Sequence, residues 1–203
     1  MLVLLGCLLT APVSGDQTGR EAWNFQLRDT NGKAFTLSDF KTKIIVLEFF
    51  ASWCGPCKPQ MAELKGIRST YLEDEVAIIS VSFDPSTDTD DALNRLAKDV
   101  GATWTLARDT IGISDKYEVN IAPTIFLIDK AFTVRFAHSG LTRSKVLTPE
   151  IDQLLSEKPP PAKGATASSD LTWILLTGLT LLIAGSILAI RRRRVSTKSR
   201  RKR

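Results

Sequence analysis

The run at residues 53–57 (WCGPC) stands between two contrasting stretches and constrains the fold of this chain more than any other feature. Residues 44–50 (IIVLEFF) are apolar, β-branched and aromatic, which predicts a buried strand. Residues 58–71 carry apolar side chains three positions apart, which predicts a helix. The two cysteines of the run therefore lie where a strand gives way to the first turn of a helix.

The alternation of strand and helix patterns continues along the chain. Residues 76–83 (VAIISVSF) predict a second buried strand, and residues 90–100 predict an amphipathic helix. Residues 124–129 and 132–136 predict two strands joined by a tight turn, and Thr148 is the expected N-cap of a last helix. Alternating elements followed by a hairpin predict an α/β fold in which helices flank a mixed central sheet.

The position of the cysteine pair indicates redox chemistry. Free N–H groups and the macrodipole at a helix N-terminus stabilise an anion, so they lower the pKa of the Cys54 thiol. A thiolate attacks a substrate disulfide and forms a mixed disulfide. Cys57, one turn further on, can attack that bond and release the reduced substrate. Pro56 favours the first helical turn, and we expect Cys57 to be more buried than Cys54.

Cysteine and histidine counts argue against other uses of the pair. The chain has three cysteines, of which Cys7 lies in an apolar N-terminal run, and one histidine, His138. A disulfide-stapled scaffold needs more cysteines, and a zinc site needs more ligands at the right spacing. Residues 84–91 (DPSTDTDD) lack the glycine and the closing glutamate of a calcium loop, which indicates a solvated loop and a helix start. We therefore expect no metal.

The charge of the chain is unevenly distributed. The net charge is +5, but residues 191–203 hold nine Lys and Arg and no acid, so removing these nine charges leaves −4 for the rest. A nucleic-acid-binding domain carries its basic footprint on the folded part. Nucleic acid is therefore not an expected partner.

Residues 171–190 form an uncharged stretch of 20 residues. At a rise of about 1.5 Å per residue, such a helix spans roughly 30 Å, the thickness of the hydrocarbon core. Four arginines follow at once, and arginines beside a span stay in the cytoplasm. We expect a transmembrane helix at 171–190, a basic cytoplasmic tail at 191–203, and an extended linker rich in Pro, Ala and Ser at 158–170.

The N-terminal segment, residues 1–15, is apolar and ends in small residues, which resembles a secretory signal. It lacks a charged start, so it is either a minimal signal or the result of a start assigned too far downstream. A third possibility is that Cys7 carries a lipid. Residues 16–157 are expected to form the folded domain, outside the cytoplasm.

A family resemblance rests on residues 49–58 (FFASWCGPCK), which resemble the active-site run of thioredoxin-fold proteins. Residues 24–33 and 37–40 resemble the opening of the extracytoplasmic redoxins typified by TlpA and ResA. The resemblance covers about residues 23–156. It implies a thioredoxin fold with an N-terminal hairpin extension and a central insertion near residues 85–105. It also implies a thiol–disulfide oxidoreductase that needs no cofactor beyond its redox-active disulfide, Cys54–Cys57.

The resemblance assigns substrate contacts to residues around the pair. Pro123 matches the cis-proline that faces the cysteines, and Ala122 and Pro123 would present backbone to an extended substrate. The alternative for Pro123 is an ordinary proline at a strand start. Trp53 would shield the disulfide and offer an apolar contact, or else pack in the core. Gly55 and Pro56 complete the expected substrate-binding set.

Two polar residues near the pair bear on proton transfer. Glu48 lies six positions before Cys54, where thioredoxins carry a buried Asp; desolvation would raise its pKa and let it accept the proton of Cys57. Its longer side chain could instead turn elsewhere. Cytochrome-maturation relatives often carry Glu three residues after the second cysteine, where this chain has Gln60. Dedicated reduction of apocytochromes is therefore not expected.

The sequence as a whole predicts a monomeric, membrane-anchored oxidoreductase that reduces protein disulfides and is recharged by an electron donor in the membrane. The CGPC run points to the reducing end of the potential scale. One alternative is a thiol peroxidase, although the Pro and Thr that usually precede a peroxidatic cysteine are missing before Cys54. Another is a non-catalytic, membrane-bound binding module in which the pair is only a structural bridge.

Overall fold

A five-stranded mixed sheet forms the centre of the computed structural model, which describes residues 17–157. Its strands are β3 (Ile44–Phe50), β4 (Val76–Ser82), β5 (Thr105–Arg108), β6 (Thr124–Ile128) and β7 (Val134–Ser139). They are ordered β5-β4-β3-β6-β7. The strands β3, β4 and β5 are parallel, whereas β6 is antiparallel to both β3 and β7. The predicted mixed α/β sheet is confirmed.

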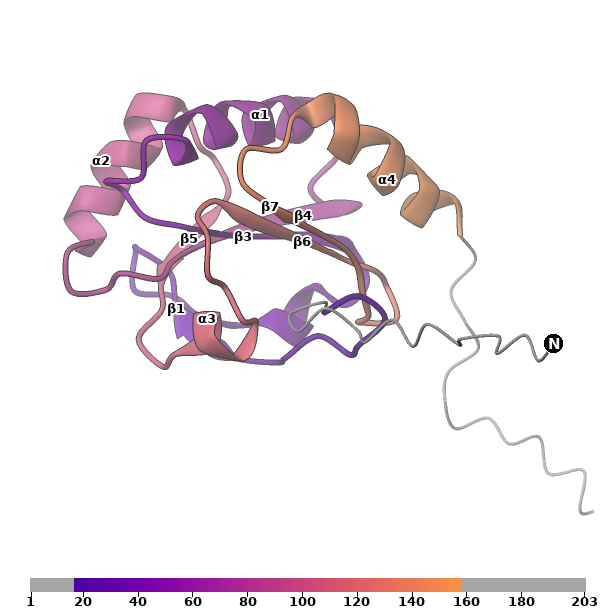
Figure 1. The fold of residues 1–203 in the computed structure, drawn as a ribbon, viewed down its shortest axis with the longest axis horizontal. Helices are drawn as coiled ribbons and strands as arrows, with labels where there is room; N and C mark the ends of the chain where they lie inside the picture. Colours follow the sequence, from indigo (N-terminus) through magenta and orange to yellow (C-terminus); the bar gives the residue numbers. More distant parts are fainter. Residues whose placement is uncertain (1–16, 158–203) are drawn as a thin grey trace, which may run out of the picture. The chain divides into compact units, whose positions relative to one another are not determined.

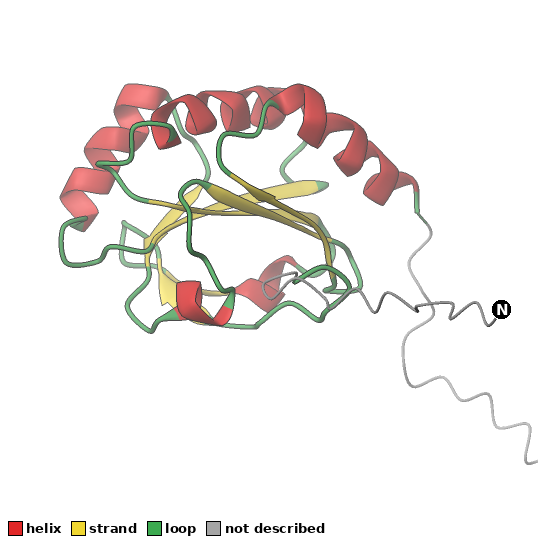
Figure 2. Cartoon of the chain, viewed as in Figure 1, coloured by secondary structure: helices red, strands yellow, loops and turns green. Residues whose placement is uncertain are grey.

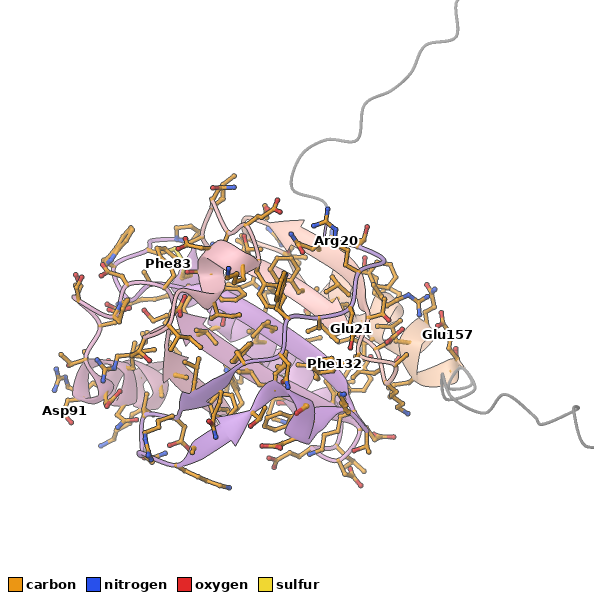
Figure 3. The ribbon with its side chains drawn as sticks, turned by 90° about the horizontal axis from the view of Figure 1, so that it is seen from below. Arg20, Glu21, Phe83, Asp91, Phe132 and Glu157 are labelled. Atoms are coloured by element: carbon orange, nitrogen blue, oxygen red, sulfur yellow. A yellow bond between two sulfur atoms is a disulfide. The ribbon has the colours of Figure 1, made fainter. Side chains whose placement is uncertain are left out.

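Two layers cover the sheet (Figures 1 and 2). One face carries the three long helices α1 (Cys57–Thr70), α2 (Asp90–Val100) and α4 (Ser144–Ser156). The other face carries the hairpin of β1 (Gln26–Arg28) and β2 (Ala34–Thr36), the 3-10 helix η1 (Leu37–Phe40) and the short helix α3 (Ile113–Lys116). Figure 3 views this second layer from below. The antiparallel hairpin matches the predicted N-terminal extension.

The central strands β3 and β4 are buried along their whole length, because both faces of the sheet are covered. Side chains of β3 alternate between the two layers. Leu47 and Phe49 join the core on the hairpin side, whereas Val46 packs with α1 and α4. Phe50 packs with the cysteines. Glu48 therefore lies on the helical face, between Val46 and Phe50.

The helix α2 has the predicted bounds because its signals are local. The Thr89 side chain accepts a hydrogen bond from the Ala92 N–H at 3.2 Å, which caps the N-terminus. Gly101 ends the helix in the left-handed region with φ 72°. The predicted central segment, residues 85–105, contains this helix and leads into β5.

The start of α4 was predicted wrongly. The helix begins at Ser144, one turn before Thr148, and Pro149 lies inside it. The reason is a tertiary cap: the Glu63 carboxylate of α1 accepts hydrogen bonds from the Ser144 N–H at 2.8 Å and its hydroxyl at 2.7 Å. These bonds lower the pKa of Glu63. A carboxylate from another helix thus replaces the local N-cap.

The last hairpin was also shifted in the prediction. β7 starts at Val134 rather than Phe132, because the Asp129 carboxylate accepts the N–H groups of Ala131 and Thr133 and widens the turn. The strand β5 and the helix α3 were missed altogether. Both are four residues long, too short to show a period.

The predicted segments at 1–15, 158–170, 171–190 and 191–203 lie outside the described residues. Within residues 17–157, no helix combines the length and the hydropathy needed to cross a bilayer.

Candidate active site

The two cysteines form a disulfide at the start of α1, with Cα atoms 5.3 Å apart. Pro56 occupies the N-cap position and Cys57 is the first helical residue. Cys57 is 1% exposed and Cys54 is 6% exposed, which confirms the predicted order of burial. No acidic residue stands in the first turn of α1, so nothing there opposes the positive end of the helix. Cys54 is thus the sulfur that a substrate can reach.

The proline loop lies against the cysteine pair. The Ala122–Pro123 peptide bond is cis, as predicted. Ala122 is half-buried and packs against the apolar cluster that contains both cysteines. The Pro123 carbonyl accepts the Gly140 N–H at 2.7 Å, which ties the loop to the segment between β7 and α4.

Gln60 is fully buried, and its hydrogen bonds explain why an amide stands at this position. Its Nε2 donates to the Thr142 carbonyl at 2.9 Å, and its Oε1 accepts the Thr142 N–H at 2.7 Å. This pairing requires a donor and an acceptor, which a carboxylate cannot both supply. Gln60 therefore links α1 to the segment that holds Pro123, a role that the sequence did not reveal.

Trp53 is 62% exposed, so the alternative of core packing was wrong. Its ring meets the edge of Phe83, labelled in Figure 3, with centroids 6.1 Å apart. Its Nε1–H donates to the Asp84 carboxylate at 2.9 Å. Hydrogen bonds from the Ser86 hydroxyl, first, and from this indole hold the pKa of Asp84 far below its usual range. The indole of the residue that precedes Cys54 is thus held in a fixed orientation.

Asp88 corrects the prediction of a solvated loop at residues 84–91, because it is fully buried. Its carboxylate accepts the Ser52 N–H at 2.9 Å, the Ser52 hydroxyl, and the Ser82 hydroxyl at 2.5 Å. The residue just before Trp53 is thereby fixed to the end of β4. Composition alone gave no signal for this contact.

Exposed apolar side chains occur in the segments that carry these contacts. Ile121 precedes Ala122, and Leu141 lies in the segment that Gln60 holds; both are exposed. With Trp53 they form what we term the apolar rim. Each of the three residues is adjacent in sequence to a residue of the site or of the segments that it joins: Cys54, Ala122 and Thr142.

Glu48 is fully buried on the helical face of β3. Its Oε2 accepts the Ser80 hydroxyl at 2.5 Å, while its Oε1 has no hydrogen-bond partner among the described residues. Burial raises the pKa of Glu48 to about 7, and the Ser80 hydrogen bond partly opposes that rise. The predicted desolvation of this carboxyl is therefore confirmed.

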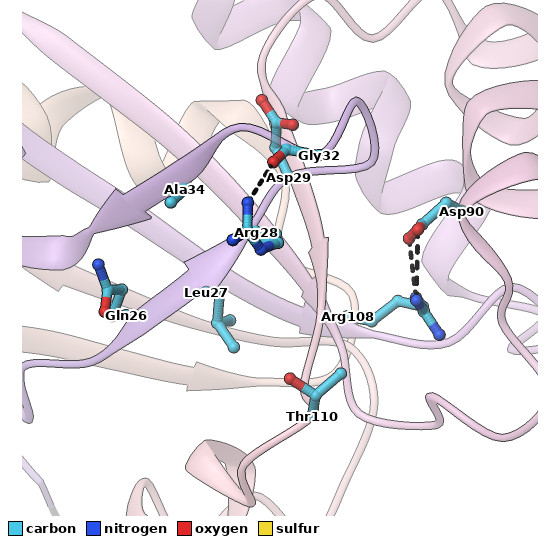
Figure 4. Close-up of a pocket in the computed structure, with 9 residues that line it drawn as sticks. All are labelled: Gln26, Leu27, Arg28, Asp29, Gly32, Ala34, Asp90, Arg108 and Thr110. Atoms are coloured by element: carbon cyan, nitrogen blue, oxygen red, sulfur yellow. Dashed lines mark hydrogen bonds and ion pairs between the residues drawn. The ribbon is translucent and has the colours of Figure 1, made fainter.

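A cavity of about 350 Å³ lies between the hairpin and β5 (Figure 4). Its charged side chains have partners: Arg108 forms a paired contact with Asp90 at 2.8 and 3.2 Å, and Arg28 donates to the Gly32 carbonyl. Neither cysteine lines it. In residues 17–157 no three His, Cys, Asp or Glu side chains converge as metal ligands do.

Comparisons with known proteins agree with this site. The AhpC/TSA family model matches residues 18–137, more than half of the chain. The chain is 28% identical to the thioredoxin-like protein YneN of Bacillus subtilis over 138 residues, which cover 68% of this chain and 81% of YneN. It is 35% identical to the thiol–disulfide oxidoreductase ResA of Bacillus subtilis over 130 residues, covering 63% of this chain and 71% of ResA.

A solved structure supports the fold as well. A protein from Chlorobium tepidum assigned as thiol:disulfide interchange protein DsbE superposes with a TM-score of 0.61 and 30% identity, covering 68% of this chain and 97% of that one. Among the YneN and ResA relatives, the matched part spans between 65% and 81% of the relative's length. The chain belongs to the AhpC/TSA family, and within it to the thiol–disulfide oxidoreductases of thioredoxin fold that are related to ResA.

Proposed function

We propose that this chain reduces disulfide bonds in protein substrates outside the cytoplasm. The observation that carries the proposal is the Cys54–Cys57 disulfide at the N-terminus of α1, packed against Ala122 of the cis-proline loop. A helix N-terminus favours the thiolate needed for exchange. The relatives named thiol–disulfide oxidoreductase support the same chemistry.

The reduced enzyme starts the cycle with Cys54. Its thiolate attacks one sulfur of the substrate disulfide; a bond forms between Cys54 and that sulfur, and the other substrate sulfur leaves with the electron pair. Cys57 then attacks Sγ of Cys54. The mixed disulfide breaks, the second substrate sulfur leaves as a thiolate, and the enzyme disulfide is restored. Two electrons have passed from the enzyme dithiol to the substrate.

In the second step Cys57 must lose its proton, and we assign the acceptor role to Glu48. Two features support this assignment: the carboxyl is buried on the helical face of β3, and its pKa is raised to about 7. A base with a pKa near the working pH exchanges protons efficiently. The solvent protonates the leaving substrate thiolate.

Substrate recognition is assigned to the apolar rim and to the backbone of the proline loop. An extended segment that pairs with the backbone of Ala122 would place its disulfide beside Cys54, while its neighbouring side chains contact Trp53 and Ile121. Gly55 and Pro56 leave the approach to Cys54 without a large side chain. Because the backbone supplies the pairing, the site accepts several protein sequences.

Location and partners complete the proposal. The uncharged run at 171–190 and the arginines after it support a single transmembrane anchor with the domain outside. A reductant outside the cytoplasm needs a source of electrons, so we propose a membrane protein as the donor. We propose that the protein works as a monomer. Cytochrome-maturation relatives often carry an acid where this chain has Gln60, and the Gln60 amide is engaged with Thr142. We therefore do not propose apocytochromes as dedicated substrates.

A trapping experiment tests the proposal. Cys57→Ala in the full-length, membrane-bound protein should accumulate mixed disulfides through Cys54, which mass spectrometry identifies. The double variant Cys54→Ala/Cys57→Ala is the control and should trap nothing. The wild type should also reduce insulin with a dithiol donor. If Cys57→Ala traps no partner and the wild type does not reduce insulin, the non-catalytic binding module is favoured. If the wild type turns over peroxide but not insulin, the thiol peroxidase is favoured.

A further inference from the structure

A chain of hydrogen bonds runs from the Trp104 indole through the Ser80 hydroxyl to the Glu48 carboxylate. Trp104 Nε1–H donates to Ser80 Oγ at 2.9 Å, and the Ser80 hydroxyl donates to Glu48 Oε2 at 2.5 Å. We propose that Ser80 and Trp104 are positioning residues that fix Glu48 so that Oε1 is the atom which takes the proton of Cys57. This inference rests on the proton-acceptor role proposed for Glu48.

The sheet places the members of this chain side by side. Glu48 and Ser80 are partners in the parallel β3–β4 ladder, so their side chains point to the same face. Ser80 is in turn paired with Leu106 of β5. Trp104 directly precedes β5, and its half-buried ring packs against the clusters that α1 forms with the sheet. Backbone register thus sets the contact between Ser80 and Glu48.

The direction of the hydrogen bonds follows from donor chemistry. An indole N–H can only donate, so Ser80 Oγ must accept from Trp104. The hydroxyl hydrogen of Ser80 is then committed to Glu48 Oε2. The indole cannot reverse its role, and while Glu48 is ionised its carboxylate can only accept, so Ser80 must donate to it. The two bonds reinforce each other in a buried environment. Oε2 is therefore occupied, and the anionic form of Glu48 is stabilised against the effect of burial.

The other carboxylate oxygen of Glu48, Oε1, has a different environment. Oε1 is buried and has no hydrogen-bond partner among the described residues. Leaving a buried oxygen unpaired costs free energy, and each exception in a folded protein needs an explanation. Protonation of Oε1 removes the buried negative charge and leaves the bond between Oε2 and the Ser80 hydroxyl in place. Oε1 is thus the atom at which a proton is gained most readily.

The ionisable neighbours of Glu48 are few. Helices α1, α2 and α4 turn the apolar side chains and the amide of Gln60 toward the sheet; of their buried residues only Cys57 ionises. On the sheet, Ile125 of β6 is the ladder partner of Glu48. His138 lies one strand beyond, with its Nε2 2.8 Å from Glu150 Oε2. Among the described residues, this face also buries Cys54, Asp88 and Tyr71; Asp88 accepts the Ser82 hydroxyl, and Tyr71 lies at the end of α1. Of these groups and Cys57, only Cys57 loses its proton in the second chemical step.

The test measures the protonation of Glu48 directly and through the second chemical step. In the oxidised full-length protein, ¹³C NMR follows the titration of the Glu48 carboxyl. In the reduced protein, a stopped-flow reaction with Ellman's reagent releases two thionitrobenzoate ions, and the second release reports attack by Cys57. Both midpoints are compared in the wild type, Ser80→Ala and Trp104→Phe. Ser114→Ala is the matched control, because its hydroxyl also donates to a carboxylate, at 2.6 Å, but in α3.

We expect Ser80→Ala to move both midpoints to higher pH by about one unit, because a hydrogen bond to the anion is lost. Trp104→Phe should move them less and in the same direction, and Ser114→Ala should leave both unchanged. Ser80→Thr retains the hydroxyl and should restore the wild-type values. If Ser80→Ala fails to fold, Trp104→Phe and Ser80→Thr give the answer.

Failures of the two proposals are distinguishable. If Glu48→Gln leaves the pH profile of the second release unchanged, the proton-acceptor role of Glu48 is wrong. If Glu48→Gln removes that pH dependence while Ser80→Ala and Trp104→Phe keep the wild-type midpoints, the role of Glu48 stands and the positioning role of Ser80 and Trp104 is overturned.

Discussion

The burial of Glu48 has a measurable consequence for the pH dependence of folding. Its pKa rises from an ordinary value of 4.5 to about 7 in the folded protein, so the folded state holds this proton more tightly than the unfolded state. The resulting stability is fully present below pH 4.5 and is lost as the pH rises through 7. At 1.36 kcal/mol per pKa unit, the loss is about 3 kcal/mol.

Replacing Glu48 with Gln should abolish this loss. The amide is neutral at every pH, and its oxygen can still accept the Ser80 hydroxyl. Urea unfolding of the oxidised full-length protein between about pH 5.5 and 8.5 measures the effect, since about 2 of the 3 kcal/mol fall in that range. The wild type should lose this stability as the pH rises, and the variant should not.

A second carboxyl provides the control for that experiment. Glu63 has a lowered pKa, so the stability that it contributes is present above its unfolded value and is lost only in acid, below the measured range. Glu63→Gln should therefore shift the free energy of unfolding by the same amount at every pH in the measured range and leave its dependence on pH unchanged. Parallel curves for the wild type and Glu48→Gln would refute the account of Glu48 as a buried, titrating carboxyl.

Three further substitutions test the site. Asp88→Ala leaves the Ser52 N–H and hydroxyl without their acceptor and should lower the free energy of unfolding, measured in urea, by about 2–4 kcal/mol. A loss below about 1 kcal/mol would contradict the view that Asp88 fixes Ser52 to the end of β4. Gln60→Glu should have a lower free energy of unfolding than the wild type at pH 8, because the new carboxylate faces the Thr142 carbonyl. The difference should shrink in acid, where the carboxyl is protonated. A difference in stability that does not change with pH would count against this contact. Trp53→Ala should lower kcat/KM for insulin reduction by about tenfold, roughly 1.4 kcal/mol of lost apolar contact, with little change in Tm. Leu72→Ala, 67% exposed at the opposite end of α1, should change neither.

Features carried by neighbouring residues could be predicted from the sequence. The bounds of α2 follow from Thr89 and Gly101, and the buried strands β3 and β4 follow from continuous apolar runs. The cysteine pair was placed correctly because a strand, a short turn and a helix succeed each other directly. The cis form of the Ala122–Pro123 bond came from the family resemblance.

Features that depend on distant partners could not be predicted. Ser52 and Asp88 are 36 positions apart, and Gln60 and Thr142 are 82 apart. Composition favoured solvent exposure for Asp88, because an aspartate is buried only where donors converge on it. The predicted start of α4 was wrong for the same reason: the Glu63 carboxylate of α1 caps the helix at Ser144, before the local N-cap signal at Thr148. Tertiary hydrogen bonds therefore account for both errors.

The pairing of Gln60 with Thr142 restricts how this site can evolve. A glutamate at position 60 would bring an acid to the site, but it would also place a carboxylate against the Thr142 carbonyl. The segment that holds the proline loop would then have to change its backbone in the same lineage. Position 60 and the conformation of residues 140–142 should therefore be inherited together, and exchanging one without the other between relatives should yield a poorly folded hybrid.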